Sequence, residues 1–219
     1  YAFNAGMYVI VNIHYDSGWW SEFGSPDASV RAAAMEKYKA VWTQVANRYK
    51  EYSDYLIFES ANEELGASLN TSSDTITSGY FTSEDEIYKQ VANINQTFVD
   101  IVRGTGGNNA LRFLLIAGYD TNITRTCDKR FVMPKDTIAS HMFISVHYYE
   151  PATYCIADSP DNSWGYSDSW GTTSDIEEMK SSFNSMRLNY INKGIPVIIG
   201  EYGVTDGKKS DGTRYRKEG

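Results

Sequence analysis

Short apolar runs alternate along the chain with longer segments of helical periodicity. Five apolar runs, each followed at once by polar residues, predict buried strands of a parallel sheet at 7–13, 55–58, 112–117, 142–146 and 195–199. Three segments, at 29–49, 83–104 and 174–194, carry apolar residues at steps of three and four and predict helices. Alternation of this kind is typical of parallel βα units.

The predicted helices also have start signals. Ser83 and Glu86 have the spacing of a capping box, and so do Ser174 and Glu177. Trp42 lies on the first helix and is expected in the core. The polar stretch 66–79 is rich in Ser and Thr and predicts a loop over one rim of the sheet.

Each predicted strand ends in residues that can perform chemistry. Parallel α/β folds place their active sites at this carboxyl end of the sheet. A doubly wound sheet would carry a Gly-rich phosphate loop after its first strand, whereas this chain has His14-Tyr-Asp. The pattern therefore predicts a single α/β domain over 1–219, an incomplete TIM (β/α)8 barrel with about five recognisable βα units. The strand-end residues are His14, Asn62 with Glu63, Tyr119 with Asp120, His147 with Tyr149, and Glu201.

Composition narrows the function classes. A net charge of -8 argues against nucleic-acid binding, and no apolar stretch approaches the ~20 residues of a membrane span. Two cysteines without a CxxC pair make a metal site unexpected, and no cofactor is indicated. Aromatic residues reach 14%, with 17 Tyr and 5 Trp, which suits ordinary core packing and also the stacking of rings on sugars.

Two carboxylates at strand tips suggest the chemistry. Glu63 follows one buried strand and Glu201 follows another, and a glycosidase needs two such groups flanking the scissile bond. One must be ionised to attack, while the other must carry a proton for the leaving oxygen, so the pKa of Glu63 is expected to be raised. Their carboxyl groups are expected to face each other about 5 Å apart, the spacing of a retaining enzyme.

Four motifs in order resemble glycoside hydrolase family 5. Two connecting segments, Thr105 to Asn109 and Met133 to Asp136, resemble its bacterial endoglucanase branch, which includes xyloglucanases and lichenases. The resemblance covers about strands three to seven of that family's barrel. The four motifs are Val11 to His14, Leu56 to Glu63, Ser145 to Tyr149 and Val197 to Gly203.

The resemblance implies roles for individual residues. Glu63 would be the acid/base and Glu201 the nucleophile of a retaining endo-β-1,4-glucanase that acts on cellulose-type β-glucan. Asn62 would hydrogen-bond the substrate's 2-hydroxyl, and His147 and Tyr149 would shape the site. Beside these, His14 joins the site, and four residues are candidates for sugar contact: Asp16, Trp20, Trp164 and Trp170. Each of the tryptophans could instead serve packing.

Three departures from the family leave alternatives open. The usual Asn-Glu-Pro is Asn62-Glu63-Glu64 here, and relatives often have His-His where this chain has His14-Tyr15. The family's first two strands, with an Arg at the nucleophile, and its eighth strand have no counterpart. The chain is therefore interpreted as a fragment or an unusually reduced barrel. It could be a non-catalytic glucan-binding or pseudo-enzyme fragment, or the same fold acting on xyloglucan, lichenan or mannan.

Further expectations concern the surroundings of the site. Glu59, inside a strand pattern, is interpreted as a structural partner, and Glu64 as a solvated or paired surface charge. The protein is expected to be secreted, in which case Cys127 and Cys155, on loops of the same rim, could form a disulfide; two separate thiols are the alternative. The outer strands at 7–13 and 195–199 would leave open edges, which predicts self-association.

Overall fold

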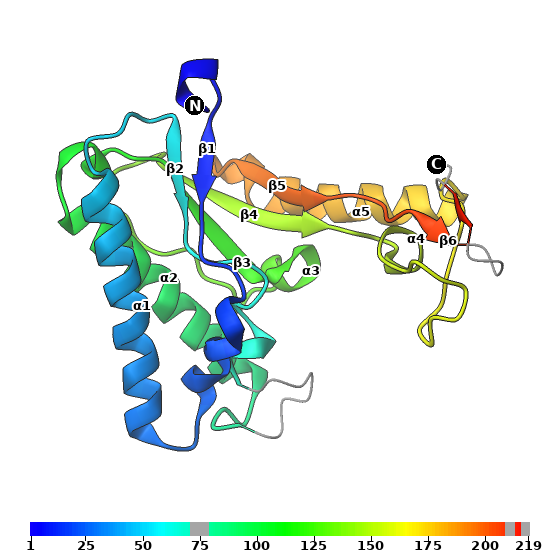
Figure 1. Ribbon diagram of the computed structural model, residues 1–219, viewed down its shortest axis with the longest axis horizontal. Coiled ribbons are helices and arrows are strands. Elements are labelled where there is room, and N and C mark those ends of the chain that lie inside the picture. Colours follow the sequence, from blue (N-terminus) through cyan, green and yellow to red (C-terminus); the bar gives the residue numbers. More distant parts are fainter. Residues whose placement is uncertain (71–78, 209–212, 216–219) are drawn as a thin grey trace.

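Five parallel strands form one sheet in the order in which they occur along the chain. The computed structural model describes residues 1–70, 79–208 and 213–215. The sheet bends into part of a barrel (Figure 1), which confirms the predicted incomplete barrel of βα units. The strands are β1 (Val9–Val11), β2 (Leu56–Glu59), β3 (Leu114–Asn122), β4 (Met142–Tyr148) and β5 (Val197–Tyr202).

Strand bounds differ from the prediction mostly at the carboxyl ends. β3 and β5 extend beyond their apolar runs, because backbone pairing with β4 continues into the polar residues that follow. β1 is shorter than its apolar run, since only three residues of it pair with β2. Of the predicted loop at 66–79, residues 71–78 lie outside the part that the structure describes.

Three long helices connect the strands, and short elements fill the remaining connections. The helices are α1 (Ala28–Tyr49), α2 (Glu84–Gly104) and α5 (Thr173–Asn189), and in Figure 1 α1 and α2 lie beside each other on one side of the sheet. The short elements are η1 (Phe3–Ala5), η2 (Asp16–Gly24), η3 (Ala67–Leu69), η5 (Gly107–Ala110), α3 (Ile123–Thr126), α4 (Ala152–Cys155) and η6 (Ile191–Lys193), with the antiparallel pair β6 (Gly207–Lys208) and β7 (Arg214–Tyr215).

Side-chain caps begin these helices, although not always at the predicted residue. The Ser83 hydroxyl accepts from the Glu86 N–H, as predicted, but the Glu86 carboxylate turns to the N–H of Thr82 at 2.7 Å. In α5 the reciprocal capping box is formed by Thr172 and Asp175, two residues before the predicted pair. Both pairs have the required spacing, so spacing alone could not choose between them.

The main core lies between α1, α2 and the sheet. Trp42 of α1 packs against Phe58 and Phe98 with ring centroids 5.7 and 4.6 Å away, which confirms its predicted place in the core. The Trp42 indole N–H and the Tyr38 hydroxyl both donate to the carbonyl oxygen of Ser60. This joins α1 to the segment that follows β2, where the candidate site residues begin.

A buried arginine joins the segments at the amino end of the sheet. Arg112, 1% exposed, lies just before β3 and stacks over the ring of Phe58 at 4.8 Å. Its guanidinium donates to four backbone carbonyls and to the side chain of Asn109. One side chain therefore joins the end of α1, the turn before β2 and the start of β3. The four carbonyls are those of Tyr49, Tyr52, Ser53 and Leu56.

A buried ion pair makes stability depend on pH. Arg103 donates to both carboxylate oxygens of Asp136, at 2.9 and 2.7 Å. Burial raises the pKa of Asp136, but the hydrogen bonds and charge of Arg103 together with the backbone N–H groups of Ile138 and Thr137 outweigh it, so the pKa is lowered. Because the folded pKa lies below the unfolded one, this stabilisation is present above about pH 4 and is lost as pH falls through the folded pKa.

We expect Asp136→Asn to lower the free energy of unfolding by about 3 kcal/mol at pH 7, because Arg103 stays buried without its partner. The wild type should lose more stability than the variant between pH 5 and pH 2. Urea unfolding at several pH values measures both. Parallel pH dependences in the two proteins would contradict the assignment.

Two further expectations meet the structure here. Cys127 and Cys155 are not joined by a disulfide, so that prediction is wrong. Cys127 ends α3 with its Sγ 3.4 Å from the sulfur of Met186 on α5, whereas Cys155 ends α4 farther along the rim. Among residues 1–70, 79–208 and 213–215, no helix combines the length and the apolar character needed to cross a membrane.

Candidate active site

An irregularity in β5 turns Glu201 toward the site. Val146 pairs with Ile199, but the next residue, His147, pairs with Glu201, so Gly200 is an extra residue in β5. Side chains alternate along a strand, and one inserted residue reverses that alternation, so Glu201 shares a face with its partner His147. A Cβ at position 200 would lie 3.3 Å from Nε2 of His147, which explains a residue without a side chain there.

Three side chains from three strand ends converge on this face. The Nδ1 of His147 lies 2.7 Å from Oε1 of Glu63 and 3.6 Å from Oε2 of Glu201. One atom from each of the three residues lies within 4.8 Å of the others. The two carboxylates therefore lie on one face, with an oxygen of each no more than 4.8 Å apart. The side chains of Glu63 and Glu201 are 52% and 35% exposed, so both can be reached from solution.

Neighbouring residues hold these groups in place. The Tyr149 hydroxyl donates to Oε2 of Glu201 at 3.0 Å, and burial together with this bond raises the pKa of Tyr149 to about 12. Tyr149 is therefore a hydrogen-bond donor throughout the neutral range. Asn62 is buried beside Glu63, and its Oδ1 has no hydrogen-bond partner among the described residues. That amide is available to a ligand hydroxyl.

A buried carboxyl lies behind the cluster. Glu59 of β2 accepts from the amide of Asn12 at 2.9 Å, as a structural partner would. Burial raises the pKa of Glu59, while the nearby rings of His147 and His14 and the hydrogen bond from Asn12 oppose that rise.

The protonation expected of Glu63 is not what the structure shows. We expected a raised pKa, and this prediction is wrong: the hydrogen bond from His147 lowers the pKa of Glu63 more than burial raises it. The physical reason is the ring N–H at 2.7 Å, which favours the ionised carboxylate. The neighbouring imidazole therefore decides how readily Glu63 holds a proton.

Replacing His147 by phenylalanine should raise the pKa of Glu63, because burial then acts without the opposing hydrogen bond. Carbon-13 NMR titration of the Glu63 carboxyl measures the change directly. His141→Phe is the matched control, since His141 lies before β4 and stacks on Phe113 far from the cluster. An unchanged or lower pKa in His147→Phe would contradict this account of the site.

A cavity of about 570 Å³ opens beside Glu63. Residues after β1 and β2, at the end of β3 and in α3 line it, and Glu201, Tyr149 and His147 are not among them. Across it, Asp120 accepts from the Ala67 N–H at 2.9 Å and forms an ion pair with Arg125. Burial raises the pKa of Asp120 although Arg125 opposes it. The lining residues are Tyr15, Glu63, Glu64, Ala67, Ser68, Asp120, Asn122 and Arg125.

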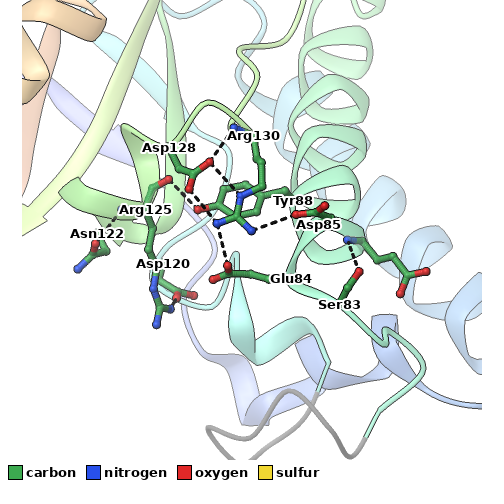
Figure 2. A network of polar contacts seen from close by, with 10 residues as sticks. Ser83, Glu84, Asp85, Tyr88, Asp120, Asn122, Arg125, Asp128 and Arg130 are labelled. Atoms are coloured by element: carbon green, nitrogen blue, oxygen red, sulfur yellow. Dashed lines mark hydrogen bonds and ion pairs between the residues drawn. The ribbon is translucent and has the colours of Figure 1, made fainter.

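A network of charges holds the segment that carries Asp120 and Arg125, two residues that line this cavity. Figure 2 shows Arg130 between Glu84 and Asp85 at the start of α2 and Asp128 in the loop after α3. The Tyr88 ring lies under the guanidinium at 4.4 Å, and its hydroxyl donates to the backbone carbonyl of Arg125. The segment that carries Asp120 and Arg125 is therefore joined to the long helix α2.

Two predicted roles need correction. Trp20 is 1% exposed and packs against Trp19, Phe23 and Tyr38, because η2 turns it into the core, so a sugar cannot stack on it. Glu64 was expected at the surface, but the turn after β2 buries it to 7% exposure.

The remaining candidates stay predictions. His14 is exposed at the end of the segment after β1, and its charge acts on Glu63. Asp16 forms an ion pair with Lys37 at 3.8 Å and does not line the cavity. Trp164 is exposed and Trp170 half-buried, both in the irregular segment before α5.

Sequence reasoning missed the cavity wall. Tyr15 follows His14 directly, and Asp120 was noted at a strand end, but neither was included among the substrate-binding residues. Arg125 had no signal beyond its charge, because its role depends on the short helix α3 turning it toward Asp120.

The cluster of Glu63, His147 and Glu201 is also the one group in the described ranges whose ligand atoms converge enough to hold a metal ion.

The chain is similar in sequence to known proteins. Among sequence relatives, the xyloglucan-specific endo-β-1,4-glucanase of Bacteroides ovatus is 35% identical over 93% of this chain and 39% of its own length. Endoglucanase A of Ruminococcus albus is 35% identical over 99% of this chain and 54% of its own. This chain spans about half the length of such relatives.

Solved structures are similar to this chain over almost its whole length. A broad-specificity endoglucanase from an uncultured bovine rumen ciliate is 38% identical, with a TM-score of 0.75 over 96% of this chain and 57% of that one. A lichenase from Caldicellulosiruptor sp. F32, solved with cellotetraose, has a TM-score of 0.78 at 29% identity, over 96% and 55%. The model of the cellulase family, glycosyl hydrolase family 5, matches residues 1–218. The chain belongs to glycosyl hydrolase family 5.

Proposed function

We propose that this chain carries the catalytic pair of a retaining endo-β-1,4-glucanase. The observation that supports this most directly is the convergence of Glu63 and Glu201, with an oxygen of each and the His147 nitrogen within 4.8 Å of one another. A separation of ~5 Å suits direct attack on the sugar, whereas an inverting pair needs room for a water between its carboxyl groups.

In the proposed mechanism Glu201 attacks the anomeric carbon while Glu63, in its protonated form, gives its proton to the departing glycosidic oxygen. The His147 hydrogen bond lowers the pKa of Glu63, so this protonated form is the minor one near neutral pH. The carbon–oxygen bond to the leaving sugar breaks as the bond to Glu201 forms. Glu63, now ionised, takes a proton from water, whose oxygen displaces Glu201 and releases the second sugar product. Tyr149 donates to Glu201 and so keeps its carboxylate oriented. The Asn62 amide is placed to bind the 2-hydroxyl.

The experiment is hydrolysis of a soluble β-glucan, followed by release of reducing ends and by proton NMR of the first anomer formed. A β-anomer that appears first supports retention, and an α-anomer first would refute it. Binding of the glucan without release of reducing ends would favour the alternative of a non-catalytic glucan-binding fragment.

The polymer is proposed as cellulose-type β-glucan. The relatives' names include endoglucanases, a lichenase and xyloglucan-specific enzymes, so xyloglucan and lichenan are the competing substrates, with mannan as a further one. Initial rates on carboxymethyl cellulose, xyloglucan, lichenan and mannan under the same conditions rank them. We further propose that the protein acts outside the cell, because such polymers are too large to enter it; assay of culture supernatant against cell extract tests this.

Association of the chain with itself is also proposed. Among the described residues, β1 pairs only with β2 and β5 only with β4, and Ile10, Ile199 and Tyr202 on these strands are exposed. Edges of this kind pair readily with another strand. Light scattering at several concentrations should show a mass that rises with concentration, and a constant monomer mass would refute association.

A further inference from the structure

One buried carboxyl beside the catalytic pair has no part in the mechanism above. Glu64 directly follows Glu63 in the turn after β2 and is 7% exposed. Its Oε2 is buried with no hydrogen-bond partner among the described residues. A buried polar atom without a partner costs free energy, so its persistence calls for a partner that binds later.

The surroundings of Glu64 favour its neutral form over the carboxylate. Burial raises the pKa of Glu64, and the nearby negative charges of Glu63 and Glu201 raise it further. A protonated carboxyl carries one O–H donor and keeps acceptor capacity, whereas a carboxylate only accepts. Sugar hydroxyls also donate and accept, so the two groups match.

The position of Glu64 relative to the reaction indicates which sugar it meets. Glu64 lines the cavity of about 570 Å³ that Glu63 borders and that Glu201 does not. The proton donor and the nucleophile flank the scissile bond, so the sugar that departs lies on the side of the proton donor. The cavity is therefore on the side of the leaving sugar, with Tyr15, Asp120 and Arg125 around it.

We propose that Glu64 is a substrate-binding residue that hydrogen-bonds a hydroxyl of the leaving glucosyl unit in this cavity. The proposal rests on the assignment of Glu63 and Glu201 as proton donor and nucleophile. It gives a function to the carboxylate that stands where the family's usual motif has proline.

The test compares two substrates in Glu64→Leu, Glu64→Gln and the wild type. A cello-oligosaccharide places a sugar in the cavity when it is cleaved, whereas 2,4-dinitrophenyl β-cellobioside places an aryl group there and needs no proton. We expect Glu64→Leu to lower kcat/KM about tenfold for the oligosaccharide, with at most a twofold change for the aryl glycoside. Glu64→Gln, which can still donate and accept, should recover most of the loss.

Equal losses on both substrates, or no loss on either, would overturn the proposal. Glu36→Leu, which removes an exposed carboxylate on α1, controls for the loss of charge, and thermal unfolding establishes that each variant is folded. If Glu64→Leu does not fold, the comparison of Glu64→Gln with Glu64→Met decides in its place.

A binding measurement separates this proposal from the proposed function. If the wild type hydrolyses neither substrate, the enzymatic proposal fails, and calorimetry with cellotetraose then tests Glu64 alone. About tenfold weaker binding to Glu64→Leu than to the wild type would still support the contact, and equal Kd values would refute it.

Discussion

Replacement of Glu201 by glutamine should lower kcat on both soluble β-glucan and an activated aryl cellobioside by roughly 10³-fold or more. Glutamine keeps the size of the side chain and can still contact Tyr149, but it cannot form the glycosyl bond. Initial rates on the two substrates measure the loss. A variant that kept more than a tenth of the activity would show that Glu201 is not the nucleophile.

The matching change at Glu63 should separate the two roles. Glu63→Gln cannot protonate a leaving oxygen, so hydrolysis of the polymer should fall by about 10²- to 10⁴-fold. Dinitrophenolate leaves without a proton, so the first step on the activated aryl cellobioside should be largely kept, visible as a burst of product. Loss of that burst as well would contradict the assignment of Glu63 as the proton donor.

Replacement of Arg112 by methionine should give the largest loss of stability outside the site. Methionine fills similar space but removes the guanidinium that donates to the carbonyls of Tyr49, Tyr52, Ser53 and Leu56 and to the side chain of Asn109. Loss of five hydrogen bonds to one cationic side chain should lower the free energy of unfolding by about 4 kcal/mol. For a chain of this size that corresponds to a fall in Tm on the order of 10 °C.

Urea denaturation and thermal unfolding measure this loss. Arg48→Met is the control, because Arg48 is exposed on α1 and contacts only the face of the Tyr49 ring, at 5.7 Å. It should stay within about 0.5 kcal/mol of the wild type. Equal stability of the two variants would show that the carbonyls around Arg112 find other donors.

Much of the fold follows from periodicity in the sequence. Continuous apolar runs located all five strands, because both faces of a parallel sheet are covered and local composition reflects that directly. Polar residues at the ends of the runs located Glu63, His147 and Glu201. Each of these lies at the end of a strand whose neighbours in space are also its neighbours in the chain.

What could not be predicted depends on contacts between distant residues. Trp20 was assigned to a cleft because its loop follows a strand, yet the turn of η2 sends it into the core. The pKa of Glu63 depends on an imidazole 84 residues away, and no local pattern reports that distance. The burial of Glu64 follows from the turn after β2, which is hydrogen-bonded to Asp120 near the end of β3. The cap of α5 was predicted two residues too late for a different reason. The pairs Thr172–Asp175 and Ser174–Glu177 have the same spacing, so spacing could not choose between them.

The position of each carboxylate in the sheet has a mechanical consequence. Glu63 follows β2, which has β1 on one side and β3 on the other, whereas Glu201 belongs to β5, bonded only to β4 in the described part of the chain. The inserted Gly200 interrupts that ladder just before Glu201. Glu63 therefore follows a strand that is paired on both sides, whereas Glu201 lies on a strand paired on one side among the described residues. The Tyr149 hydroxyl, on the segment after β4, gives Glu201 a second attachment beyond that ladder.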